Sequence, residues 1–120
     1  MHLGADVVGL SLDLPSDPCN FEIVCHGSGI TDSRGDVRDR ETLQRIFDTY
    51  EPEAVFHLAA QPLVQRSHEE PALTFDTNVM GTVRVLDCLR SNATVKAAVF
   101  ITSDKCYQNQ ESSRVRIKMY

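Results

Sequence analysis

The sequence has few basic residues and no long apolar run, and each shortage argues against a class of function. It holds 12 lysines and arginines against 17 aspartates and glutamates, which gives a formal net charge of -5. Nucleic acid and anionic membranes both require a basic face, so neither is expected as a partner. No stretch approaches the roughly 18 apolar residues of a membrane span, and the first residues show no signal-peptide pattern. A cytoplasmic location is therefore expected.

Cysteine and histidine are also sparse and scattered. The four cysteines form no Cys-x-x-Cys pair, which argues against a disulfide framework or a zinc site and predicts reduced thiols. The four histidines are equally dispersed, so no metal site is expected. These residues are Cys19, Cys25, Cys88 and Cys106, and His2, His26, His57 and His68.

What the chain does contain is an alternation of strand and helix patterns. With 120 residues it has the length of one domain, and its 42% apolar content is ordinary for a globular protein. Strands are predicted over residues 6–10, 54–58 and 97–102, and helices over residues 39–50 and 74–90. Because alternating strands and helices imply right-handed crossovers, the fold class is α/β, part of a doubly wound, Rossmann-type parallel sheet with flanking helices.

The two predicted helices rest on different sequence signals. In residues 39–50, Asp39 is a plausible N-cap, Pro52 lies beyond the end, and one face carries Leu43, Ile46, Phe47 and Tyr50. In residues 74–90 an apolar stripe is predicted to pack on the sheet. The stripe consists of Phe75, Val79, Val83, Leu86 and Leu89.

A complete dinucleotide-binding domain opens with a strand, a glycine-rich turn and a helix that holds the pyrophosphate. Residues 1–5 read instead as the end of such a helix. Gly27-Ser28-Gly29 follows a strand-like stretch at 21–25, but Asp32 occupies the third glycine position and no helix of useful length follows. The first strand and the glycine-rich turn are therefore expected to be missing.

The apolar run that ends in Thr102-Ser103-Asp104-Lys105 is the best candidate for chemistry. Its polar end is expected at the carboxyl edge of the sheet, where ligands bind in open α/β folds. A hydroxyl, an acid and a base on Ser103, Asp104 and Lys105 suit proton transfer to a bound substrate. The alternative is a strand that simply runs into a polar turn.

Four motifs resemble the CDP-glucose 4,6-dehydratase family of the extended short-chain dehydrogenase/reductase superfamily, in that family's order and spacing from about Gly4 to Glu111. The Gln61-Pro62-Leu63-Val64 and Ser103-to-Tyr107 stretches are the specific ones, since related dTDP-glucose dehydratases have a glutamate in place of Lys105. The motifs are Gly35-Asp36-Val37-Arg38-Asp39, His57-Leu58-Ala59-Ala60-Gln61-Pro62-Leu63-Val64, Thr77-Asn78-Val79-Met80-Gly81-Thr82 and Thr102-Ser103-Asp104-Lys105-Cys106-Tyr107.

The resemblance implies NAD as cofactor and CDP-glucose as substrate. Asp36 and Val37 would lie beside the adenine, although an aspartate there also suits a turn or helix cap. Asn78 would organise the site near the nicotinamide, with a solvated surface position as its alternative. The cofactor residues implied are Asp36, Val37, Leu58, Ala59, Ala60, Gln61, Asn78 and Thr102. For Leu58 to Gln61, tight helix–sheet packing is a second explanation of the small side chains.

The implied reaction has three steps: oxidation at C4 of the glucose, loss of water across C5 and C6, and reduction at C6, with NAD regenerated in each turnover. Ser103 would bond the 4-hydroxyl and Asp104 would protonate the departing 6-hydroxyl. Lys105 stands where related enzymes keep the carboxylate that removes the C5 proton. A lysine serves as base only if its pKa falls well below about 10.4, and it could instead merely neutralise Asp104.

The chain departs from the family at both ends. No Tyr-x-x-x-Lys pair exists, since Tyr50 is followed at that spacing by Ala54 and Tyr107 by Glu111. Beyond residue 111 the family continues with a tryptophan-containing stretch, whereas this chain has no tryptophan. We therefore expect residues 1–111 to be a partial NAD-binding Rossmann domain and residues 112–120 a divergent tail.

Three interpretations follow. The first is an internal fragment of the dehydratase, inactive alone, whose parent enzyme is a homodimer by resemblance. The second is a non-catalytic remnant that binds a nucleotide or a partner. The third is a relative of the NAD-dependent sugar-nucleotide epimerases.

Overall fold

The computed structural model describes residues 4–12, 21 and 29–103. Several expectations concern residues outside this range, namely Asp104, Lys105, the tail 112–120, and Gly27 and Ser28 of the rejected glycine turn. Phe21, expected at the start of a strand, is helical, and residues 22–25 lie outside the description. No helix in the described part of the chain is long and apolar enough to cross a membrane.

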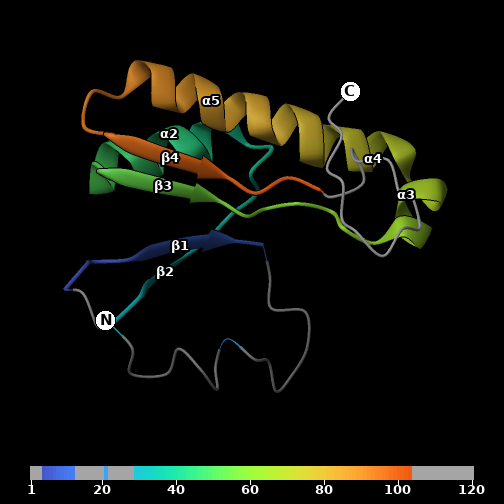
Figure 1. Cartoon of the computed structure of the whole chain (residues 1–120), viewed down its shortest axis with the longest axis horizontal. Helices are drawn as coiled ribbons and strands as arrows, with labels where there is room; N and C mark the ends of the chain where they lie inside the picture. Colours follow the sequence, from blue (N-terminus) through green and yellow to red (C-terminus); the bar gives the residue numbers. More distant parts are fainter. Residues whose placement is uncertain (1–3, 13–20, 22–28, 104–120) are drawn as a thin grey trace, which may run out of the picture.

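Four strands and a set of helices alternate along the chain (Figure 1). The α/β class is confirmed, and strands and helices fall close to their predicted positions. The strands are β1 (Val8–Ser11), β2 (Thr31–Arg34), β3 (Ala54–His57) and β4 (Ala97–Phe100). The helical elements are α2 (Arg40–Tyr50), α3 (Val64–Glu69), α4 (Pro71–Phe75), the π-helical turn η1 (Asp76–Met80) and α5 (Gly81–Ser91).

The strands form two separate parallel pairs. β1 pairs with β2, with Val8 opposite Thr31, and β3 pairs with β4, with Ala54 opposite Ala97. In the described part of the chain no ladder joins one pair to the other. In Figure 1 the arrowheads of β1, β3 and β4 lie on the same side of the molecule. Loops that follow these strands therefore meet at one edge.

Helix α2 has the ends that its sequence predicts. The Asp39 carboxylate accepts from the backbone N–H of Glu41 at 3.0 Å and from the Thr42 hydroxyl at 2.7 Å, which confirms the N-cap. The helix closes at Glu51, whose left-handed backbone (φ 43°) lets its N–H donate to the Phe47 carbonyl. Pro52 follows at once and cannot continue the helix.

The second predicted helix is longer and less regular than its pattern indicates. It begins at Pro71, three residues before the predicted start, and widens into the π turn η1 before α5. A π turn bonds each N–H to the carbonyl five residues back; such turns are rare, and they frequently occur at functional sites. Asn78, a predicted site residue, lies in the middle of this turn.

The predicted packing face of this helix is wrong. Phe75, Val79, Val83 and Leu86 are 67%, 50%, 42% and 48% exposed, and only Leu89 of the stripe contacts the core. The buried residues of α5 are instead Gly81, Val85 and Cys88. Small side chains at 81 and 88 let the helix approach its neighbours closely, and α5 carries apolar residues on two faces. Periodicity alone therefore could not select the packing face.

The core lies between α2, α5 and one face of each strand pair. It consists of Leu43, Phe47, Val85 and Cys88, and Leu10, Val37, Val55 and Phe100 pack against it. The opposite face of the β3–β4 pair is open, because Phe56 and Val99 on that face are 67% and 43% exposed. Residues 97–100 are thus a strand as predicted. An apolar run this short suggests a strand buried on both faces, but here Ala97 to Val99 are exposed.

Candidate functional site

Apart from Asn78 in the π turn, the predicted site residues that the structure describes lie in three loops that follow β2, β3 and β4. Asp36 and Val37 come after β2, Leu58 to Gln61 come after β3, and Thr102 and Ser103 come after β4. The β3 and β4 loops are neighbours, since the Ile101 N–H donates to the His57 carbonyl at 3.1 Å and extends the pairing beyond β4. The exposed Thr102 and Ser103 therefore lie beside the start of the β3 loop.

Gly35 sets the turn that places Asp36. A Cβ atom at this position would lie 2.5 Å from Cγ2 of Thr42 and 3.3 Å from Cδ1 of Leu10. Only a residue without a side chain lets β2 pass so closely under the first turn of α2. The Gly35 N–H also donates to the Ser11 carbonyl, which holds the turn against β1.

The Asp36 carboxylate is held by Arg38. Oδ1 accepts from the Arg38 backbone N–H at 2.8 Å, and Oδ2 accepts from Nε and Nη2 at 2.9 and 2.6 Å. These hydrogen bonds and the guanidinium charge lower the pKa of Asp36 despite its partial burial, so it is an anion at neutral pH. Its oxygens provide about four acceptor sites, of which three are occupied, so Oδ1 retains one for a ligand N–H.

Charged side chains connect this turn to the π turn. Arg38 Nη1 lies 3.8 Å from Asp76, and Arg84 Nη1 donates to the same carboxylate at 3.1 Å. Val37 packs beside them against the first residue of α5, where a Cβ on Gly81 would come within 2.9 Å of Val37 Cγ1. The sequence interpretation missed this Arg38–Asp76–Arg84 series, because its members are far apart in the chain.

Asn78 clamps the β3 loop from the π turn. Its Oδ1 accepts from the Gln61 backbone N–H at 2.7 Å and its Nδ2 donates to the Gln61 carbonyl at 3.1 Å. The solvated surface position considered for Asn78 is therefore wrong. The Gln61 side chain is also engaged, because its amide bonds Leu63 through both backbone groups and the Thr74 hydroxyl. Asn78 and Gln61 thus fix the path of the loop that holds Ala59 and Ala60.

Thr82 connects the π turn to β3, and the sequence interpretation missed it. Its hydroxyl donates to the Asn78 carbonyl at 2.7 Å, and His57 Nε2 lies 3.0 Å from the Thr82 hydroxyl oxygen. Because the hydroxyl hydrogen is used, the ring nitrogen must be the donor, which assigns the Nε2–H tautomer. Burial lowers the pKa of His57. The spacing of four residues from Asn78 was the available signal.

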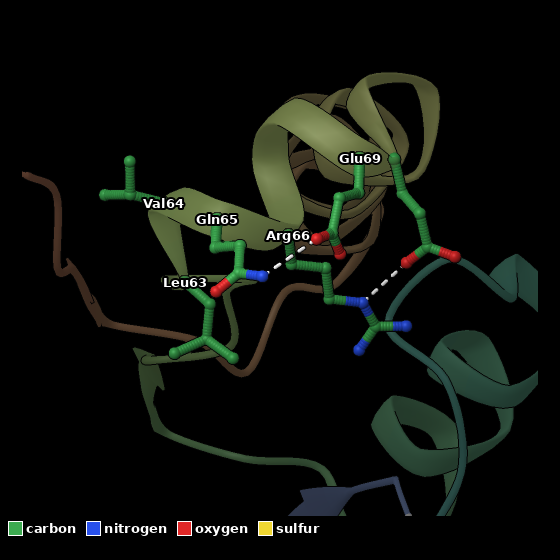
Figure 2. Close-up of a pocket in the computed structure, with 6 residues that line it drawn as sticks. Leu63, Val64, Gln65, Arg66 and Glu69 are labelled. Carbon is green, nitrogen blue, oxygen red and sulfur yellow. Dashed lines mark hydrogen bonds and ion pairs between the residues drawn. The ribbon is translucent and has the colours of Figure 1, made fainter.

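The hollow found on the surface does not coincide with these loops. It has a volume of about 480 Å³, and its lining comes from one contiguous segment around α3 (Figure 2). Gln65 bonds Glu69 and Arg66 bonds Glu70 along that helix. Leu63 and Val64, also in the lining, are exposed. None of the predicted site residues lines the hollow. No group of three metal-ligating side chains occurs among the described residues.

Comparison with known proteins shows which family the chain belongs to. The family model for GDP-mannose 4,6 dehydratase matches residues 23–116. The chain belongs to the GDP-mannose 4,6 dehydratase family. Among its curated relatives, the CDP-glucose 4,6-dehydratase of Salmonella typhimurium is 49% identical over 110 residues, which are 92% of this chain and 31% of that protein.

Solved structures agree on the fold. The UDP-glucose-4-epimerase of Stenotrophomonas maltophila, with bound NAD and formylated UDP-arabinopyranose, matches with a TM-score of 0.80 at 28% identity, over 95% of this chain and 34% of that one. The Thermus thermophilus UDP-glucose 4-epimerase complex with NAD matches with a TM-score of 0.78 at 30% identity, over 96% of this chain and 36% of that one. This member of the dehydratase family therefore spans about a third of the length of these relatives.

Proposed function

We propose that this chain forms the cofactor-facing part of an NAD-dependent nucleotide-sugar 4,6-dehydratase that acts on CDP-glucose. The observation that carries the proposal is the 49% identity to a CDP-glucose 4,6-dehydratase across nearly the whole chain. The structure adds support, because the matching loops gather at the carboxyl ends of the strands, where α/β folds bind ligands.

The described residues fit NAD. Asp36 offers a carboxylate with one free acceptor site for the exocyclic amine of adenine. Leu58, Ala59 and Ala60 are exposed, and the two alanines leave the backbone open to close approach by ribose and phosphates. Gln61 and Asn78 would act by fixing this loop, and Val37 and Thr102 complete the set. When bound, NAD supplies the hydride acceptor and donor that the reaction needs.

For the chemistry we propose the roles that the family resemblance implies. Ser103 bonds the sugar 4-hydroxyl, Asp104 protonates the departing 6-hydroxyl, and Lys105 takes the C5 proton. Ser103 is exposed at the end of β4, and Asp104 and Lys105 lie beyond the described residues. A lysine that acts as base requires desolvation or a nearby cation, since its ordinary pKa is about 10.4.

An epimerase is the second candidate. The observation in its favour is that the two solved structures reported above, both with NAD, are UDP-glucose 4-epimerases. The products distinguish the two activities, because a 4,6-dehydratase removes the 6-hydroxyl whereas a 4-epimerase only inverts C4.

A chimera tests the proposal. Residues 4–111 would replace the matching stretch of the Salmonella typhimurium dehydratase, and conversion of CDP-glucose would be followed by mass loss of water. We expect the chimera to form a 4-keto-6-deoxy sugar and Asp104→Asn to lower its turnover at least about a hundredfold. Glu69→Gln, at an exposed position of α3 away from the predicted site residues, is the matched control and should leave turnover unchanged.

The purified 120-residue chain is assayed in parallel. We expect no dehydration, because the Tyr-x-x-x-Lys pair is not in its sequence. A folded chimera that interconverts UDP-glucose and UDP-galactose without water loss would support the epimerase. A folded chimera with neither activity would contradict both candidates and leave a non-catalytic binding role.

A further inference from the structure

An arginine at the end of β2 holds an aspartate of the same strand. Arg34 Nε and Nη2 donate to Oδ2 of Asp32 at 2.9 and 2.6 Å. Arg38 holds Oδ2 of Asp36 through the same two nitrogens at the same two distances. Two Asp-x-Arg pairs of equal geometry therefore stand on either side of Gly35 in the sequence. The proposed cofactor site explains the second pair and leaves the first without a role.

The Arg34 guanidinium is fixed at the carboxyl end of β1. Its Nη1 donates to the Ser11 hydroxyl and to the Leu12 carbonyl, each at 2.9 Å. The Phe21 ring lies against it, with the guanidinium carbon 5.2 Å from the ring centroid. Four of its five N–H groups are thus engaged. An arginine held from so many directions keeps the Asp32 carboxylate in one orientation.

The Asp32–Arg34 pair lies beside the turn for which we propose adenine binding. Ser11 stands opposite Arg34 in the parallel ladder of β1 and β2 (Figure 1). The Ser11 carbonyl also accepts from the N–H of Gly35 at 2.9 Å, and Asp36 is the next residue. The side chains of Asp32 and Arg34 are half-buried, at 33% and 32% exposed, so a ligand at this turn can reach them.

One oxygen of Asp32 is available to such a ligand. Both hydrogen bonds from Arg34 go to Oδ2, and Oδ1 has no hydrogen-bond partner in the described part of the chain. An ionised carboxylate only accepts, so its partner must be an N–H or O–H donor. If the exocyclic amine of adenosine binds Asp36, the donors that remain are the ribose hydroxyls. In dinucleotide-binding folds an acidic residue accepts from the ribose 2′-hydroxyl of NAD.

We propose that Asp32 binds the 2′-hydroxyl of the adenosine ribose through Oδ1, and that the Asp32–Arg34 pair makes this chain select NAD over NADP. The inference rests on the proposed NAD site, in which Asp36 contacts the adenine. In NADP a phosphate replaces the hydrogen of this hydroxyl, so the hydrogen bond to Asp32 is lost and two negative charges meet. Selectivity therefore comes from a repulsive contact as well as an attractive one.

Arg34 does not offset this repulsion. A nearby arginine accommodates the 2′-phosphate in NADP-binding folds, but Arg34 is neutralised by Asp32 and tied to the end of β1 by Ser11 and Leu12. Asp32 thus has two effects, because it supplies the acceptor for the hydroxyl and withholds the guanidinium from a phosphate. Removal of its charge should reverse the preference.

The test measures nucleotide binding to the full 120-residue chain by NMR. The probes are 5′-AMP, 2′-deoxy-5′-AMP and adenosine 2′,5′-bisphosphate, and the amide signals of Asp36 and Val37 report binding. We expect 5′-AMP to bind at least about tenfold more tightly than its 2′-deoxy form, because the latter lacks a hydrogen bond to a charged group. The bisphosphate should bind at least about tenfold more weakly than 5′-AMP.

Asp32→Asn removes the charge at an exposed site with little change in shape. The preference for 5′-AMP over its 2′-deoxy form should fall below about threefold, since a neutral amide oxygen is the weaker acceptor. The bisphosphate should bind at least about tenfold more tightly than to the unchanged chain, because Arg34 has lost its counter-ion. Addition of Arg34→Gln to Asp32→Asn should abolish that gain.

Two further variants locate the contacts. Asp36→Asn should weaken 5′-AMP and 2′-deoxy-5′-AMP by the same factor, because it alters the adenine contact alone. Asp87→Asn is the matched control, since Asp87 forms an ion pair with Arg90 at the surface of α5, and all three affinities should stay unchanged. Circular dichroism checks that each variant keeps its helices.

Each other result overturns the inference. If the unchanged chain binds 5′-AMP and its 2′-deoxy form equally while Asp36→Asn weakens both, the adenine contact stands and Asp32 does not bind the ribose. If Asp32→Asn loses its helices, Asp32 is a structural residue. If no nucleotide shifts the two amide signals, this chain has no ribose contact. The chimera assay follows water loss from CDP-glucose, so it judges the proposed reaction separately from these results.

Discussion

Two turns at the same edge of the sheet are built in opposite ways. The turn after β2 is held by residues next to it: Arg38 grips Asp36 two positions away, and Asp39 caps the helix that follows. The loop after β3 is held from a distance, because Asn78 reaches it from seventeen residues further along the chain.

The two turns therefore become ordered by different contacts, one by contacts between neighbouring residues and the other by contacts with a distant helix. A turn held by its neighbours depends only on its own short stretch of sequence, and few residues lose conformational entropy when it becomes ordered. A loop held from a distant helix is ordered only when that helix is packed. The β2 turn should therefore respond to steric changes in its own residues, and the β3 loop to changes in η1 and α5.

The largest effect is expected at Gly35. Gly35→Ala would place a methyl group 2.5 Å from Thr42, which is buried, and should destabilise the fold by about 2 to 3 kcal/mol. Urea unfolding followed by circular dichroism measures it. Gly9→Ala is the control, because its nearest neighbour would be 3.9 Å away, and it should change stability by less than about 0.5 kcal/mol. Equal losses in both variants would show that the β2 turn is not sterically set.

The same contrast explains what the sequence predicted. The capped helix α2 and its end followed from Asp39 and Pro52, since those signals are local. The stripe from Phe75 to Leu89 failed, because α5 has apolar residues on two faces and packing with α2 chose the one with Gly81 and Cys88. Asn78 was identified, but its partner Gln61 and the link through Thr82 to His57 depend on which elements meet.

The second effect tests the distant clamp, which consists of the Asn78 hydrogen bonds to the Gln61 backbone and the Thr82–His57 link behind them. Asn78→Ala removes both hydrogen bonds to the Gln61 backbone and should cost about 1 to 2 kcal/mol in global stability. Its sharper signature is local, since amide exchange at Gln61 should become fast while that at Arg38 stays slow.

Asn92→Ala is the matched control for removing an amide. Its Oδ1 bonds Thr94 two residues away, so the effect should stay in the turn before β4. If Asn78→Ala leaves exchange at Gln61 unchanged, local contacts such as those between the Gln61 side chain and the Leu63 backbone hold the β3 loop, and the contrast between the two turns is lost.

The smallest expected effect is a pH dependence of folding stability that involves the β3 loop and not the β2 turn. Burial lowers the pKa of His57 below its unfolded value of about 6.5, so the unfolded chain takes up the proton more readily. The stability that neutral His57 contributes is then complete above pH 6.5 and is lost as pH falls below it, at up to about 1.4 kcal/mol per pH unit until the folded pKa is passed. The pKa of Asp36 is lowered as well, but the stability that its carboxylate contributes is lost only below its ordinary pKa of 3.8.

Thermal unfolding between pH 7 and 5 should therefore weaken the His57–Thr82 link of the distant clamp and spare the β2 turn. His57→Asn should flatten this dependence, whereas His68→Asn, on the exposed α3, should keep it. A slope that survives in His57→Asn would assign the titration elsewhere.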